Sequence, residues 1–192
     1  LASASAPRLQ TDFNAQELAM TIWAFAKMEH GGVTREVASA ARARADDLEA
    51  QSLATITLSL VKLDCKDGKA LKALAKAARK RMTEFNAQDL DNVASAFARL
   101  GKPRWGARLT IAIADSGVAR LQGNGNGNGS GGWQQQQQQR FPARNLTNLI
   151  WAVAKLSTSC KLGRGVVVTD PSLVALASAV ASEMVGRIDE FN

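Results

Sequence analysis

One segment, FNAQELAMTIWAFAKM, recurs along this chain with its apolar and small residues at equivalent positions. Its four copies are Phe13–Met28, Leu48–Leu63, Phe85–Leu100 and Phe141–Leu156, and Phe191-Asn192 has the start of a fifth. The first three copies begin 35 and 37 residues apart, and later intervals are longer because they contain inserted sequence. Self-similarity at a period of about 20–50 residues is typical of stacked repeats. We therefore expect an all-α fold, an α-solenoid of stacked helix-turn-helix repeats.

Each copy has the pattern of an amphipathic helix with a defined start. Asn14 and Glu17 have the spacing of a capping box, and Asn86 with Asp89 repeats it. An apolar residue before each helix is spaced to form a hydrophobic staple with one inside it, in the pairs Phe13/Leu18, Leu48/Leu53, Phe85/Leu90 and Phe141/Leu146. Apolar residues then follow at helical spacing, as in Leu18, Ile22, Phe25 and Met28.

The sequence between the copies has room for one more helix in each repeat. The expected second helices are Val33–Ala45, Lys69–Met82, Arg104–Leu121 with Gly117 as an earlier end point, and Pro171 to about Val185 with Asp170 as N-cap. The repeats of about 35–38 residues are then 13–47, 48–84, 85–140 and 141–190, with a further one opening at 191. Such helix pairs must stack to bury their apolar faces.

Two insertions interrupt this pattern. Residues 123–139 are rich in Gly, Asn and Gln, a composition that cannot build a core, so we expect a disordered loop there. Residues 157–169 separate the two helices of the fourth repeat. The chain also lacks an initiating Met and ends inside a motif, so we expect a segment of a longer protein.

Several classes of function find no support in the sequence. Cys65 and Cys160 have no CxxC spacing and are interpreted as free thiols. The lone His30 is interpreted as a helix cap or surface residue, and no catalytic constellation or phosphate-binding loop is present. No apolar run is long enough to cross a bilayer. We expect no enzymatic activity, no metal or other cofactor, and no membrane partner.

The chain is basic, with a net charge of +7, and the excess is concentrated in the second repeat. Lys69, Lys72, Lys76 and Arg79 are at helical spacing and should form one basic stripe. Such a stripe attracts phosphate backbones. The alternative is a solvated helix face that only keeps the protein soluble.

Equivalent positions of the four copies form columns when repeats stack. The columns are Lys27, Lys62, Arg99 and Lys155; Gln16, Gln51, Gln88 and Arg144; Met20, Thr55, Asn92 and Asn148; and Trp23, Leu58, Ser95 and Trp151. Within each helix these positions step by about four, three and four residues and so share one face. Helical-repeat proteins that read single-stranded RNA, one base per repeat, use side chains in this way.

This face and the basic stripe of the second helix together define the candidate site. The residues expected to face bases are Gln16, Gln51, Thr55, Gln88, Asn92, Arg144 and Asn148. The residues expected to hold phosphates are Lys27, Lys62, Lys69, Lys72, Lys76, Arg79, Arg99 and Lys155. A structural alternative exists for each column, since basic residues in a last turn complement the helix dipole and Trp is more often a core residue.

The repeated motif F-N-A-Q-[ED]-L…W-A-[FV]-A-[KR]-[ML] resembles the octotricopeptide repeat family of green algal organelle proteins. The likeness covers all four copies and is most specific in the first and fourth, because Leu58 and Ser95 replace the Trp in the other two. It implies a nucleus-encoded protein of the chloroplast or mitochondrion that binds organelle mRNA or rRNA. Members of this family act in RNA stability, processing, splicing or translation, some as parts of organelle ribosomes.

Looser kin of the family are the RAP-domain and FAST kinase-like proteins, but no RAP-like segment occurs in this chain. The competing hypothesis is a helical-repeat scaffold that binds protein partners, alone or within a ribonucleoprotein complex.

Overall fold

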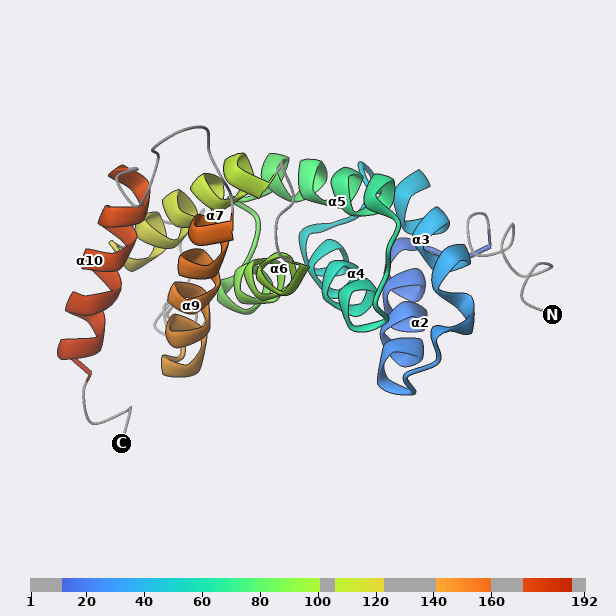
Figure 1. The fold of residues 1–192 in the computed structure, drawn as a ribbon, viewed down its shortest axis with the longest axis horizontal. Helices are drawn as coiled ribbons and strands as arrows, with labels where there is room; N and C mark the ends of the chain where they lie inside the picture. The colour runs from blue at the N-terminus through green and yellow to red at the C-terminus, as the bar shows by residue number, and fades with distance from the viewer. Residues whose placement is uncertain (1–11, 101–105, 123–140, 160–170, 188–192) are drawn as a thin grey trace, which may run out of the picture. The chain divides into compact units, whose positions relative to one another are not determined.

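The computed structural model describes residues 12–100, 106–122, 141–159 and 171–187 (Figure 1). All regular structure in these ranges is helical, which confirms the all-α prediction. The chain divides into two compact units, unit 1 (Leu1–Arg81) and unit 2 (Met82–Asn192), and each is described by itself.

Unit 1 contains two helical hairpins that lie side by side. Its elements are α2 (Ala15–Lys27), the short 3-10 helix η1 (Gly31–Val33), α3 (Thr34–Ala43), α4 (Ala50–Lys62) and α5 (Gly68–Lys80). The motif helix α2 packs along the motif helix α4, and α3 packs along α5 (Figure 1). Motif helices therefore form one layer of the unit and second helices form the other.

Unit 2 repeats this arrangement with the third and fourth copies. Its helices are α6 (Ala87–Leu100), α7 (Gly106–Leu121), α9 (Ala143–Ser159) and α10 (Pro171–Val185). The closest packing is again between like helices, α6 with α9 and α7 with α10. The stacking of neighbouring repeats expected from the sequence is thus present within each unit.

The helix starts follow the predicted capping chemistry. The side chain of Asn14 accepts from the backbone N–H of Glu17 at 2.8 Å, and the Glu17 carboxylate accepts from the Asn14 N–H at 2.7 Å. Asn86 and Asp89 form the same box at 2.8 and 3.3 Å. The staple residues are buried except for the half-buried Phe13. The two caps and four staples place the apolar face of each motif helix toward the core.

Helix α7 ends at Leu121, as predicted, and continues through Gly117, which faces Leu149 of α9 and Leu176 of α10. Other boundaries differ from the prediction. Helix α3 is shorter than Val33–Ala45 at both ends, and α5 ends at Lys80 rather than Met82. Helix α9 runs to Ser159, so the first three residues of the expected insertion 157–169 belong to the helix. Helix α5 begins at Gly68, because the Asp67 carboxylate accepts from the N–H groups of Lys69 and Ala70.

Some predictions lie outside the described residues. These are the disordered loop 123–139, the remainder of the insertion 157–169, the start of a repeat at 191, and the roles given to Cys160, Asp170 and Arg104.

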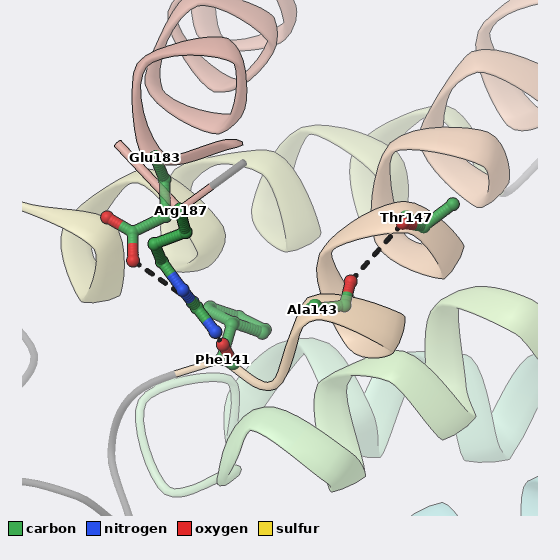
Figure 2. Close-up of polar contacts among 5 residues, drawn as sticks. All are labelled: Phe141, Ala143, Thr147, Glu183 and Arg187. Atoms are coloured by element: carbon green, nitrogen blue, oxygen red, sulfur yellow. Dashed lines mark hydrogen bonds and ion pairs between the residues drawn. The ribbon is translucent and has the colours of Figure 1, made fainter. Parts of the chain in front are cut away.

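An arginine near the end of each second helix closes its repeat. Its guanidinium donates to a backbone carbonyl just before or at the entry of the motif helix of the same repeat, in the pairs Arg44–Phe13, Arg81–Asp46, Arg120–Thr83 and Arg187–Phe141. In the fourth repeat the buried Arg187 donates to the Phe141 carbonyl at 2.7 Å and to the Glu183 carboxylate at 3.1 Å (Figure 2). We refer to these four contacts as the arginine braces.

Candidate nucleic-acid interface

The solvent-facing side of α4 coincides with the predicted columns. Gln51 and Lys62 are exposed and Thr55 and Leu58 are half-buried, whereas most other positions of this helix are buried. Since α4 packs against α2, α3 and α5, only one strip of its surface is left to solvent. The four column positions make up most of that strip.

On helix α6 of unit 2 the column positions account for even more of the accessible surface. Gln88 and Arg99 are exposed, Asn92 and Ser95 are half-buried, and only the terminal Leu100 is otherwise not buried. The predicted face of α6 is therefore its whole accessible surface, apart from the last residue.

The other two motif helices have more exposed surface, and their columns lie within it. On α2, Gln16, Met20, Trp23 and Lys27 are all exposed. On α9, Arg144, Trp151 and Lys155 are exposed and Asn148 is half-buried. No column residue is fully buried, and their roles in binding stay predictions.

The column amides of unit 1, Gln16 and Gln51, have no hydrogen-bond partner among the described residues. The same holds for the Thr55 hydroxyl. Their donors and acceptors face solvent, so a base edge could pair with them without displacing an existing partner.

The amide groups of unit 2 instead form a polar network between α6 and α9. Gln88 donates to Asn92 at 3.0 Å and accepts from the buried Asn145 at 3.4 Å. Asn148 donates to the Asp91 carboxylate at 3.1 Å. A base that reads Gln88 or Asn148 must therefore share or replace hydrogen bonds that join two repeats, and one that reads Asn92 competes with its bond to Gln88.

A second set of hydrogen bonds between α6 and α9 is built on Asp91, a buried carboxylate that sequence reasoning did not single out. Its oxygens accept from the Ser95 hydroxyl at 3.0 Å and from Asn148. Burial raises the pKa of Asp91, and these two hydrogen bonds and the charges of Arg144 and Arg99 oppose that rise. The sequence does contain one signal, because the equivalent position is Ala19 in α2 and Ala54 in α4. A carboxylate at a position that is small and apolar in these two helices indicates a polar partner nearby.

The basic column lies at the exposed ends of the motif helices. Lys27, Lys62 and Arg99 are in last turns, where a contribution to the helix dipole also accounts for them. In α9 the helix continues to Ser159, so Lys155 is about one turn before the end. The capping explanation therefore does not extend to all four members of the column.

The basic stripe lies on a different layer of unit 1. Lys69, Lys72, Lys76 and Arg79 are exposed on α5, whose buried side packs against α3 and α4. Its neighbours are paired, since Lys66 contacts Asp64 and Lys80 contacts Asp46 at 2.6 Å. The sequence placed this stripe on the second helix of its repeat, and in the structure it forms a positive surface on the second-helix layer, apart from the columns.

The sequence also singled out one histidine and one described cysteine. His30 is exposed beside the Phe25 ring, as expected of a surface residue. Cys65 is a free thiol, and burial raises its pKa, which disfavours the reactive thiolate. Within the described ranges no group of His, Cys, Asp and Glu could hold a metal ion. No helix among the described residues is long and apolar enough to span a membrane.

Comparison of the chain with protein-family models, with curated proteins and with solved structures finds no match. The motif helices and their accessible strips are therefore the features that bear on function.

Proposed function

We propose that this protein binds single-stranded RNA through the accessible strips of its motif helices, without catalytic activity of its own. In this proposal Gln16, Gln51 and Thr55 of unit 1 contact base edges, as do Gln88, Asn92, Arg144 and Asn148 of unit 2. Lys27, Lys62, Arg99 and Lys155 contact the phosphates beside them.

The observation that carries the proposal is the composition of the strip on α4 and α6. These helices expose little surface, and that surface combines an amide near one end with a cation near the other, Gln51 with Lys62 and Gln88 with Arg99. Amides provide both donor and acceptor groups for base edges, and the cation favours the adjacent phosphate. Unbroken stacking of all four repeats into one solenoid is part of the proposal, because one strand could then contact successive strips.

The resemblance to the octotricopeptide repeats supports the same proposal and extends it. It favours organelle mRNA or rRNA as the target, in a chloroplast or mitochondrion, with a role in RNA stability, processing, splicing or translation.

The test is the affinity for an unstructured RNA as a function of salt. The parent chain should lose affinity steeply as salt rises, because each phosphate contact releases counterions and contributes about −0.7 to the slope on a single strand. Replacing Lys27, Lys62, Arg99 and Lys155 together by Gln should weaken binding and flatten this slope, with helicity measured by circular dichroism unchanged.

A matched variant separates local contacts from net charge. Replacing Lys69, Lys72, Lys76 and Arg79 by Gln removes the same number of charges from the second-helix layer, and it should weaken binding less. Equal losses of affinity in the two variants would mean that the column residues contribute only through the net charge of the protein. An affinity that stays flat with salt in the parent chain would refute the phosphate contacts.

A protein-binding scaffold is the second candidate, and one feature favours it. Helix α2 exposes Met20, Trp23 and Met28, with exposed fractions of 54%, 42% and 65%, and exposed apolar side chains are common in protein interfaces. A partner that co-purifies with the chain and stays bound after nuclease treatment would support this candidate over RNA.

A further inference from the structure

Two tryptophans occupy the same column position and are unusually exposed. Trp23 on α2 is 42% exposed and Trp151 on α9 is 47% exposed, although Trp is on average a highly buried residue. Unit 1 contains one of them and unit 2 the other. Both rings lie between the amide and the cation of their strips, where a bound strand would pass under the function proposed above.

Each ring is paired with the lysine one turn further along its helix. The ammonium of Lys27 lies 5.6 Å from the centroid of the Trp23 ring, and that of Lys155 lies 4.9 Å from the Trp151 ring. Both distances are within the range of a cation–π contact. The same small assembly of an exposed indole and an adjacent cation thus occurs in both units.

Packing does not account for the aromatic rings. The equivalent positions hold Leu58 in α4 and Ser95 in α6, and these helices stack in the same manner as α2 and α9. A side chain as small as Ser therefore suffices for the fold at this position. The indole leaves two-fifths or more of its surface in water in the two repeats that carry it, so part of its surface is open to a contact outside the chain.

We propose that Trp23 and Trp151 are stacking platforms for unpaired bases of the bound strand, an inference that rests on the RNA-binding function proposed above. In the free protein the lysine covers part of the ring. A base that stacks on the indole displaces the ammonium, which then contacts the phosphate of the same or the next nucleotide. The exchange is favourable because stacking of a base on an aromatic side chain stabilises more than an exposed cation–π contact.

The occupant is a nucleic-acid base because of what surrounds the ring. A cation beside a flat aromatic face complements a nucleotide, which is a planar ring attached to an anion. On α2 the exposed amide of Gln16 lies on the same strip, and on α9 the exposed guanidinium of Arg144 does. An apolar peptide would gain nothing from the lysine, whereas a nucleotide can use both groups.

The test uses tryptophan fluorescence of the full chain with Trp105 and Trp133 replaced by Phe, so that the emission comes from Trp23 and Trp151 alone. The probes are short oligoadenylate and an RNA backbone of the same length that lacks bases. Oligoadenylate should quench the emission because its bases stack on the indoles. The base-free backbone should bind through its phosphates and leave the emission nearly unchanged.

The matched variants replace both tryptophans by Leu, the residue that the second repeat carries at this position, or by Phe. The Leu variant should bind oligoadenylate about tenfold or more weakly than the parent, while its affinity for the base-free backbone stays the same. The Phe variant keeps an aromatic ring, so its affinity for oligoadenylate should lie between those of the parent and the Leu variant. Circular dichroism serves as the check that all three are folded.

The outcomes separate the two proposals. If the parent binds oligoadenylate with salt-dependent affinity but shows no quenching, and the Leu variant binds equally well, then the stacking platforms are refuted and RNA binding stands. If the parent binds neither probe, the proposed function fails and the stacking platforms fail with it.

Discussion

The two units build the same stack of motif helices with different contacts. Between α2 and α4 of unit 1 no side-chain hydrogen bond occurs, and the buried positions on α2 are Leu18, Ala19, Ile22 and Ala26. Between α6 and α9 of unit 2, Gln88, Asp91, Asn145 and Asn148 join the helices through hydrogen bonds. The same repeat pattern therefore leaves its polar groups unoccupied in one unit and uses them for stacking in the other.

This difference teaches that a polar column position does not by itself indicate a ligand contact. Gln51 and Gln88 are equivalent in sequence and both are exposed, yet only Gln88 already has partners. If both units bind RNA, the column amides of unit 1 can do so without loss of internal hydrogen bonds. Unit 2 must exchange hydrogen bonds, so its readout and its stability should be coupled. The following variants compare the two units in stability and in pH dependence.

The largest effect is expected when the arginine brace of unit 2 is removed. Arg187→Met removes the donor to the buried Phe141 carbonyl and the ion pair with Glu183, so unit 2 should lose about 1.5–3 kcal/mol of stability. The matched variant Arg81→Met removes a brace that is exposed to solvent in unit 1, and it should cost less than about 1 kcal/mol. Hydrogen exchange of α9 and α10 peptides, with urea unfolding, measures both; equal losses would contradict the difference in burial.

A smaller effect is expected at the closely packed glycine of unit 2. A Cβ at Gly117 would lie 2.8 Å from a methyl carbon of Leu176 and 3.2 Å from one of Leu149, and both leucines are fully buried. Gly117→Ala should therefore destabilise the chain by about 1–2 kcal/mol, since the leucine tips can rotate only in part. At Gly68 of unit 1 a Cβ would meet nothing within 4 Å, so Gly68→Ala should be neutral or stabilise by about 0.4–1 kcal/mol. Thermal unfolding of the two variants decides; a destabilised Gly68→Ala would show that unit 1 is packed more tightly there.

The smallest effect is a difference in pH dependence. Burial raises the pKa of Asp91 above its ordinary 3.8, so the folded unit holds a proton that the unfolded chain releases, and the free energy of unfolding falls as pH rises through this window. Asp91→Asn removes the titration and keeps an oxygen that can accept hydrogen bonds. Its urea midpoint, relative to the parent, should therefore improve as the pH rises above 3.8, the ordinary pKa of the carboxyl.

Asp46 of unit 1 provides the control of opposite sign. The hydrogen bond and charge of Lys80 lower the pKa of Asp46, so this exposed pair contributes stability above the ordinary pKa that is lost as pH falls. Asp46→Asn should thus be slightly less stable than the parent near neutral pH and equal to it in acid. A pH-independent difference for Asp91→Asn would contradict the assignment of a titrating buried carboxylate.

Much of this architecture could be predicted because it depends on local chemistry. The capping boxes at Asn14 and Asn86, the staples and the helical spacing act within a few residues, and the helices begin close to where these signals place them. The strip on α6 followed from the same periodicity. The accessible face of a motif helix is the face that its apolar pattern excludes from the core.

What sequence reasoning missed depends on contacts between distant residues. Asp91 gives no local signal of its role, because its partner Asn148 is 57 residues away. The sequence also left an earlier end of α7 at Gly117 open, and the helix runs to Leu121 with Gly117 facing Leu149 and Leu176.

The arginine braces bear on how an array of this kind can grow. Each arginine donates to a carbonyl at or just before the start of the motif helix of its own repeat, and their separation ranges from 31 residues in Arg44–Phe13 to 46 in Arg187–Phe141. The contact thus tolerates extra residues inside the hairpin. A stretch of gene that runs from the accepting carbonyl to the donating arginine encodes both partners, so its duplication or lengthening would carry this contact along.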